Sequence, residues 1–194
     1  MLPVQNATAS EVDGVLNLNL RFTAQVTRAL LPILAKADTD VKLEETEMTK
    51  APPFLILNLS SVTGLWGFPL LGVYSGTKAF ILMWSRGLSQ ELAMQPRLSA
   101  GECMCLETGE VTGGGGDSSK ASFITPNTDT FVKATLDKVG CGRMSLRPYI
   151  GHDLVISLSV DLLPEWALKL MFKMTMAEQA RFWRNREMEL AKKQ

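Results

Sequence analysis

Tyr74 and Lys78 stand four residues apart in the segment GVYSGTKAF (72–80). On a helix this spacing places both side chains on one face. A phenol ordinarily loses its proton near about pH 10, and a neighbouring ammonium group lowers that pKa. The pair therefore predicts Tyr74 as a general acid and Lys78 as the group that tunes it. The alternative is an ordinary amphipathic helix surface, because this spacing alone is a weak motif.

Two serines precede this helix. Ser60 and Ser61 stand at the end of the short apolar run FLILNLS (54–60), which is typical of a strand buried on both faces in a parallel sheet. The carboxyl ends of parallel strands are where α/β proteins build their sites. A serine hydroxyl at this place can hydrogen-bond a substrate carbonyl oxygen, so we expect a site between this strand and Tyr74.

The first helix is expected over 11–37, with Ser10 as its N-cap and Asp13 as a negative charge in its first turn. Its apolar residues recur at helical spacing. Asn17 and Asn19 interrupt that pattern, and a buried amide requires a hydrogen-bond partner.

The remaining pattern alternates strands and helices. Pro96 ends the helix that contains Tyr74. An α/β order of this kind implies right-handed crossovers around a parallel sheet. The other expected elements are a solvated acidic loop at 38–50, a helix over 72–94, a strand within 98–107, a flexible glycine-rich loop at 108–122, a helix within 125–140, a strand followed by a helix within 148–166, and a tail helix from Pro164.

Composition excludes several classes of function. The chain has 20 basic and 20 acidic residues, and this zero net charge argues against general nucleic-acid binding. The odd number of cysteines indicates a reducing compartment. Cys103 and Cys105 could begin a metal site, but His152 is the only histidine and a closed zinc site needs four ligands. We therefore expect no metal, and two small apolar side chains on one face of a strand. The first residues are not typical of a signal peptide, and no apolar run is long enough to span a bilayer.

The stretch LILNLSSVTGLWGFPLLGVYSGTKAFILMWSRGLSQEL resembles the catalytic segment of the short-chain dehydrogenase/reductases. It is most similar to the branch of the 17β-hydroxysteroid dehydrogenases and very-long-chain 3-oxoacyl-CoA reductases. The family motif Asn-x-Ser-Ser occurs at 58–61, and Tyr-x-Ala/Gly-Ser/Thr-Lys occurs at 74–78. The segment VLNLNLRFTAQVTRALLPIL resembles the family's preceding helix, with Asn19 in the place of its catalytic asparagine. The resemblance is close over residues 10 to 112 and loose beyond.

The resemblance implies a role for each residue. Tyr74 donates a proton to a carbonyl oxygen, Ser61 orients that carbonyl, and Lys78 lowers the tyrosine pKa and binds the ribose of the cofactor. Asn19 holds a water that relays protons to Lys78, and Thr112 stands where a cofactor-binding threonine is often found. The implied cofactor is NADP, with NAD as the alternative, and the implied substrate is a steroid or a long-chain acyl group.

The sequence also departs from the family. It contains no Thr-Gly-x-x-x-Gly-x-Gly motif, and GGGG at 113–116 has the wrong spacing to replace it. Thr108-Gly109 stands where the family usually has Pro-Gly. The resemblance therefore implies the C-terminal part of a Rossmann-like doubly wound parallel sheet, without its first strands, in an N-terminally truncated chain. We expect a partial catalytic domain over 1–150 and a helical extension over 151–194. The rival hypothesis is an inactive fragment that acts, if at all, through oligomerisation or partner binding.

The tail mixes aromatic and apolar residues with basic ones. A basic amphipathic helix of this kind can lie on a membrane surface, but the favoured interpretation is a helix that packs on the domain or at a homo-oligomer contact. The resemblance implies a location at the endoplasmic reticulum membrane surface or in the cytoplasm. Trp66, Phe68 and Leu71 are candidates for an apolar pocket between Ser61 and Tyr74.

Overall fold

The computed structural model describes residues 3–35, 53–113 and 120–177, together with residues 181, 182, 185 and 188. The expected acidic loop at 38–50, most of the glycine run and the end of the tail lie outside the described residues.

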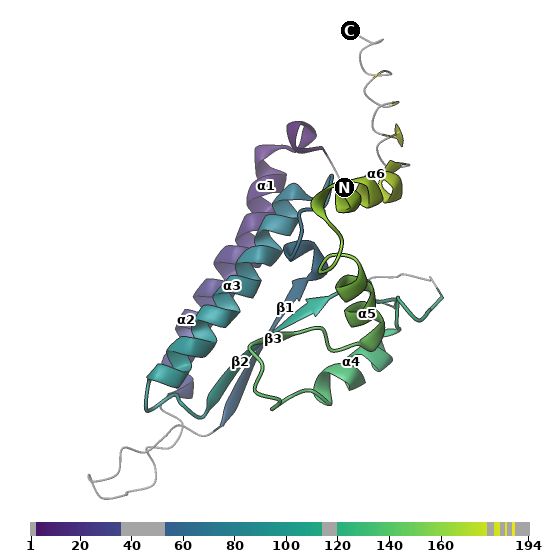
Figure 1. The fold of residues 1–194 in the computed structure, drawn as a ribbon. Helices are drawn as coiled ribbons and strands as arrows, with labels where there is room; N and C mark the ends of the chain where they lie inside the picture. Colours follow the sequence, from purple (N-terminus) through teal and green to yellow (C-terminus); the bar gives the residue numbers. More distant parts are fainter. Residues whose placement is uncertain are drawn as a thin grey trace, which may run out of the picture.

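Three parallel strands form the sheet, in the order β1-β2-β3 (Figure 1). They are β1 (Phe54–Ser61), β2 (Gly101–Thr108) and the two-residue β3 (Ser145–Leu146). The register runs from Phe54 opposite Gly101 to Ser61 opposite Thr108, so β1 and β2 end together at one edge of the sheet. The expected α/β class with a parallel sheet is confirmed.

Burial differs between the two long strands. In β2 the residues Cys103 to Glu107 are all buried, as expected for a strand between two neighbours. In β1 the side chains of Leu55 and Leu59 are exposed. The prediction that residues 54–60 are buried on both faces is therefore wrong, because β1 is an edge strand among the described residues and helices cover only one of its faces.

A long helical segment and α3 cover one side of the sheet (Figure 1). The segment consists of α1 (Ala9–Leu16), a π-helical turn η2 (Asn17–Arg21) and α2 (Phe22–Leu34). Its N-cap is Thr8, not Ser10: the Thr8 hydroxyl accepts from the Glu11 amide, and the Glu11 carboxylate accepts from the Thr8 amide. The structure favours Thr8 because Glu11 then completes a reciprocal capping box.

The helix α3 (Gly72–Met94) runs along the sheet and carries much of the core. Its buried residues Leu88 and Leu92 pack with Leu98 and Cys103, and its residues Ile81 and Leu82 pack with Cys105. The chain leaves the helix at Gln95, directly before Pro96, as expected. The register of Tyr74 and Lys78 is therefore fixed by apolar contacts further along the same helix.

Residues 120–177 form three short helices (Figure 1). They are α4 (Thr128–Leu136), capped by Asn127, α5 (Ile150–Leu158) and α6 (Glu165–Thr175). The strand expected within 148–166 lies earlier, at β3, where Ser145 accepts two hydrogen bonds from Arg86 of α3. Single 3-10 turns occur at η1 (Val4–Asn6) and η3 (Val62–Gly64). No helix in the described part of the chain is long and apolar enough to cross a membrane.

His152 of α5 fixes the loop that follows β2. The Gly109 amide donates to Nδ1 at 3.2 Å, so Nε2 carries the proton and donates to the Glu110 carbonyl at 3.0 Å. The ring is 3% exposed and lies against Phe131 and Tyr149. A Cβ on Gly109 would come within 2.6 Å of the imidazole, so only glycine permits this approach.

The expected domain boundary at 150/151 stays a prediction. Contacts cross it in both directions, since His152 bonds Gly109 and Phe172 of α6 lies against Phe68 at 4.3 Å between ring centroids.

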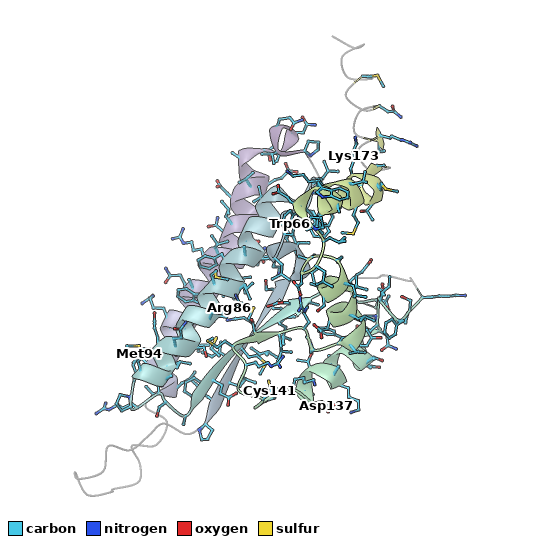
Figure 2. The ribbon with its side chains drawn as sticks, in the orientation of Figure 1. Trp66, Arg86, Met94, Asp137, Cys141 and Lys173 are labelled. Carbon is cyan, nitrogen blue, oxygen red and sulfur yellow. The ribbon has the colours of Figure 1, made fainter. Side chains whose placement is uncertain are left out.

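Replacing Leu92 by alanine is expected to lower the free energy of unfolding by about 2–5 kcal/mol, because this side chain is 0% exposed and its removal leaves a cavity. Met94, at the far end of α3 from α6 (Figure 2), is 82% exposed, and Met94→Ala should change stability by less than about 0.5 kcal/mol. Urea denaturation of both variants measures the difference. Equal effects would contradict the described packing of α3.

Burial lowers the pKa of His152 below its ordinary value of 6.5. As the pH falls, the unfolded chain therefore takes up this proton before the folded chain does, so stability is fully present above pH 6.5 and declines below it. We expect the free energy of unfolding to fall as the pH drops below about 6.5, and to fall less in a His152→Gln variant. Urea denaturation at several pH values checks the slopes; parallel slopes would show that His152 does not titrate with folding.

Candidate active site

The end of β1 is tied to α3 by the motif Asn-x-Ser-Ser. Asn58 donates to the Ser85 hydroxyl at 2.9 Å, and the Ser60 hydroxyl donates to the Lys78 carbonyl at 2.6 Å. Side chains alternate along a strand, so Ser61 points away from the face that these two bonds occupy. Ser60 therefore has a structural role, and Ser61 is the serine left for chemistry.

Gly64 allows the turn after β1 to lie directly on α3. A Cβ at this position would come within 2.7 Å of the Lys78 carbonyl carbon and 2.8 Å of the Ala79 nitrogen. Backbone atoms cannot move aside as a side chain can, so Gly64 is required here. The same turn orients Ser61, whose Oγ accepts from the Thr63 amide at 3.2 Å and keeps its proton for another acceptor.

Tyr74 and Lys78 lie on one face of α3, as expected. The Lys78 Nζ donates to the Leu59 carbonyl at 2.9 Å and lies 5.4 Å from the centroid of the Tyr74 ring. The Ser61 hydroxyl lies close enough to the Tyr74 hydroxyl to lower its pKa. The strand end and the helix thus bring these three side chains together.

The direction of the Tyr74 pKa shift is opposite to the expected one. Burial raises the pKa of the phenol, and the hydrogen bond from Ser61 opposes this only partly. Burial also lowers the pKa of Lys78. The ammonium donates to the Leu59 carbonyl and lies over the Tyr74 ring, and burial outweighs any lowering of the phenol pKa.

Asn19 lies in the π-helical turn of the first helical segment. Its Nδ2 donates to the Thr77 hydroxyl at 3.1 Å, and Thr77 in turn donates to the Tyr74 carbonyl at 2.7 Å. This answers why an amide stands within an apolar helix: it links that helix to the turn of α3 that carries Tyr74. Single π-helical turns occur frequently at functional sites.

Thr112 lies apart from these residues. It is buried, and its backbone bonds Pro126 and the Thr128 hydroxyl, next to a bridge with Asn127. The structure thus brings Ser61, Tyr74 and Lys78 to one place, connects Asn19 to them only through Thr77, and puts Thr112 on the loop held by His152.

Two cavities adjoin the site. The larger, of about 510 Å³, begins at Val62, the residue after Ser61, and is lined by Phe68, Gly109, His152 and residues of α5 and α6. The smaller, of about 180 Å³, lies between α1 and the Leu70–Tyr74 turn. Of the expected pocket residues, Phe68 lines the first and Leu71 the second, whereas Trp66 lines neither.

Within the described residues, no cluster of three metal-ligating side chains occurs. Cys103 and Cys105 are buried in β2, and burial raises the pKa of Cys103 to about 11. The expectation of two small side chains on one face of a strand is confirmed.

Sequence reasoning missed two residues that shape the site. Gly64 lies three residues after Ser61, in a stretch that gives no periodic signal. From the sequence, His152 is a candidate only as a metal ligand. His152 stands two residues after the start of α5 and bonds Gly109, 43 positions away. Its structural role depends on where the loop after β2 meets α5, and no local motif predicts that contact.

Three comparisons agree with this geometry. The family model described as short chain dehydrogenase matches residues 1–108. Very-long-chain 3-oxoacyl-CoA reductases of Emericella nidulans and Schizosaccharomyces pombe are 30% and 29% identical to this chain, over 99% and 75% of its length. These matches cover 53% and 39% of those two proteins, so the chain spans about half the length, or less, of the curated relatives it matches.

Solved structures share the fold. A 7β-hydroxysteroid dehydrogenase aligns with a TM-score of 0.63 at 16% identity, over 88% of this chain and 61% of its own. A short-chain dehydrogenase of Burkholderia cenocepacia in complex with NADP aligns at 0.61 and 18% identity, over 83% and 62%. With the family model matching more than half of its residues, the chain belongs to the short-chain dehydrogenase family.

Proposed function

We propose that this chain carries the catalytic residues of an NADP-dependent reductase that converts the 3-oxo group of a long-chain acyl-CoA to a hydroxyl. The observation that carries the proposal is the placement of Ser61, at the end of a parallel strand, beside Tyr74 and Lys78 of α3. The names of the curated relatives supply the substrate class.

The residues present fit one part of the cofactor. The Lys78 ammonium has three donors, and one of them binds the Leu59 carbonyl, which leaves two for the hydroxyls of a ribose. Tyr74 lies beside it and can share that contact. No residue of the described chain is assigned to the adenine or the pyrophosphate, and NAD stays an alternative to NADP.

Each side chain then has a defined task. When bound, the nicotinamide nucleotide supplies the hydride that adds to the carbonyl carbon. Tyr74 gives its proton to the carbonyl oxygen, and its raised pKa keeps it protonated at neutral pH. Ser61 donates a hydrogen bond to the same oxygen and orients it, while its own oxygen accepts from the Thr63 amide. Asn19 acts through Thr77 by fixing the turn that carries Tyr74.

The larger cavity supports an apolar substrate. The lining of this cavity is mostly apolar, and its volume is about 510 Å³. The lining includes Val62, which directly follows the catalytic Ser61. A long acyl chain buried there loses its contact with water, which favours binding. A steroid is the other substrate class, and a solved relative of this fold is a hydroxysteroid dehydrogenase. By the same family analogy we propose a location at the endoplasmic reticulum membrane surface, with the cytoplasm as the alternative, and assembly into a homo-oligomer.

Replacing Tyr74 by phenylalanine is expected to lower the rate of carbonyl reduction by about two to four orders of magnitude, because the proton donor is lost. Oxidation of NADPH in the presence of a long-chain 3-oxoacyl-CoA measures this rate. The matched control is Tyr149→Phe, since Tyr149 is the only other tyrosine and contacts His152 through its ring. Equal rates in the two variants would contradict the role of Tyr74, and a wild-type chain that neither binds nor oxidises NADPH would favour the inactive-fragment hypothesis.

The two neighbouring serines give a second test. Ser61→Ala should lower the rate by about a hundredfold, because Ser61 contacts the reacting oxygen, and should lower the free energy of unfolding by at most about 1 kcal/mol, through loss of the bond from the Thr63 amide. Ser60→Ala should lower the free energy of unfolding by about 1 kcal/mol, because it loses the bond to the Lys78 carbonyl. Enzyme assays and urea denaturation of both variants separate the effects. A larger loss of rate in Ser60→Ala than in Ser61→Ala would overturn the division of roles.

A further inference from the structure

Leu70 has a left-handed backbone conformation, with a φ of 63°. Among the described residues it is the only one besides glycines with a positive φ. For a bulky side chain this conformation is strained, because the Cβ comes too close to the following carbonyl oxygen. Such residues persist only where their surroundings hold them, and they cluster at active sites and ligand clamps. Leu70 stands in the loop that joins Ser61 to Tyr74, so the strain lies within the candidate site.

A β-turn over residues 68–71 contains the strained leucine. The Leu71 amide donates to the Phe68 carbonyl at 3.2 Å, and Pro69 occupies the second position of the turn. A proline followed by a residue of positive φ is the pattern of a type II turn, whose third position favours glycine or asparagine. Glycine at position 70 would carry no strain, so we looked for a role of the leucine side chain that offsets it.

The turn is fixed to the helix that carries Tyr74. The Phe68 amide donates to the Ser75 hydroxyl at 3.3 Å, and the Ser75 amide donates to the Leu71 carbonyl at 2.7 Å. Ser75 is itself buried. On the other side, the Phe68 ring packs against Phe172 of α6. The turn therefore cannot relax away from Tyr74 without losing contacts at both ends.

The same turn separates the two cavities that adjoin the site. Phe68 belongs to the lining of the larger cavity, of about 510 Å³. Leu70 and Leu71 line the smaller cavity, of about 180 Å³, together with Tyr74. The opposite wall of the smaller cavity comes from η1 and α1 and is mostly apolar, with Val4, Val12 and Val15. The side chain of Leu70 is thus part of the wall next to the catalytic tyrosine.

The volumes of the two cavities indicate how a ketone would lie in them. Small-molecule pockets usually measure about 300–1,000 Å³, so the larger cavity can hold a long branch and the smaller only the first atoms of a second branch. A carbonyl oxygen that accepts from Ser61 and Tyr74 lies between the cavities, because Val62 borders the larger and Tyr74 the smaller. In a 3-oxoacyl-CoA the second branch begins with the methylene between the ketone and the thioester.

We propose that Leu70 determines the specificity of the site: its side chain, held in place by the strained turn, narrows the smaller cavity so that only a ketone with an unbranched second arm reaches Ser61 and Tyr74. This inference rests on the proposed function, because it concerns the substrates of the same site. It favours a linear acyl chain over a steroid, whose ketone has ring carbon atoms on both sides.

Two ligands that differ only in the second arm test the proposal. They are 3-oxohexadecanoyl-CoA and its 2,2-dimethyl derivative, titrated calorimetrically into the full chain with oxidised NADP, which cannot reduce them. The wild type should bind the linear ligand at least about tenfold more tightly, since the two methyl groups meet the Leu70 side chain. Leu70→Gly and Leu70→Ala should each reduce this ratio to about threefold or less, mainly through tighter binding of the dimethyl ligand.

The control is Leu162→Ala, because Leu162 is 70% exposed and lines neither cavity. This variant should keep the ratio of the wild type. Urea denaturation separates the side chain from the backbone: Leu70→Gly should unfold at a higher urea concentration than Leu70→Ala, since glycine adopts the left-handed conformation without strain. A lower midpoint for Leu70→Gly would show that the turn is not strained.

An unchanged ratio in both Leu70 variants, or a wild type that binds neither ligand or both equally, would overturn the proposed role of Leu70. A wild type that selects the linear ligand as expected but does not oxidise NADPH with it would contradict the reductase alone. Turnover of the linear ligand together with an unchanged ratio in the variants would contradict the role of Leu70 alone. The two failures are therefore distinguishable.

Discussion

The junction between β1 and α3 is the constraint on which the site depends. The Ser60 hydroxyl bonds the Lys78 carbonyl, Asn58 bonds Ser85, and Gly64 allows the following turn to touch the helix backbone. These contacts fix the strand end relative to the helix without using the side chains of Tyr74 or Lys78. A catalytic group is most effective when its neighbours hold it in place, and here the holding groups and the reacting groups alternate along the same short motif.

Burial has a larger effect than charge on the pKa values of Tyr74 and Lys78. Loss of water raises the pKa of Tyr74 and lowers that of Lys78, so both groups shift toward their neutral forms. The simple picture of an ammonium that lowers a phenol pKa requires the ammonium to face the hydroxyl. In this structure Lys78 faces the ring and a backbone carbonyl, so it acts mainly as a positioned donor.

Much of the fold was predictable because its elements are long and periodic. Apolar spacing and Pro96 predict the bounds of α3, and the strand predicted within 98–107 corresponds to β2. The two-residue β3 could not be predicted, because it is held by a hydrogen bond from the Arg86 side chain as well as by its short pairing with β2. Thr8 was missed as the cap because Ser10 is also a good capping residue, and only the Glu11 side chain decides between them.

In the site, Ser61, Tyr74 and Lys78 followed from local motifs. His152 and Gly64 did not, since their importance lies in contacts with backbone far along the chain.

The three cysteines divide this chain into one reactive and two protected thiols. Cys141 is exposed, whereas Cys103 and Cys105 are buried in the central strand, where burial raises their pKa values. The thiolate is the species that reacts with alkylating reagents and oxidants, so the folded molecule offers Cys141 alone. A count of modified thiols by mass spectrometry would therefore distinguish folded from unfolded molecules, and a single label can be attached at Cys141 without any substitution.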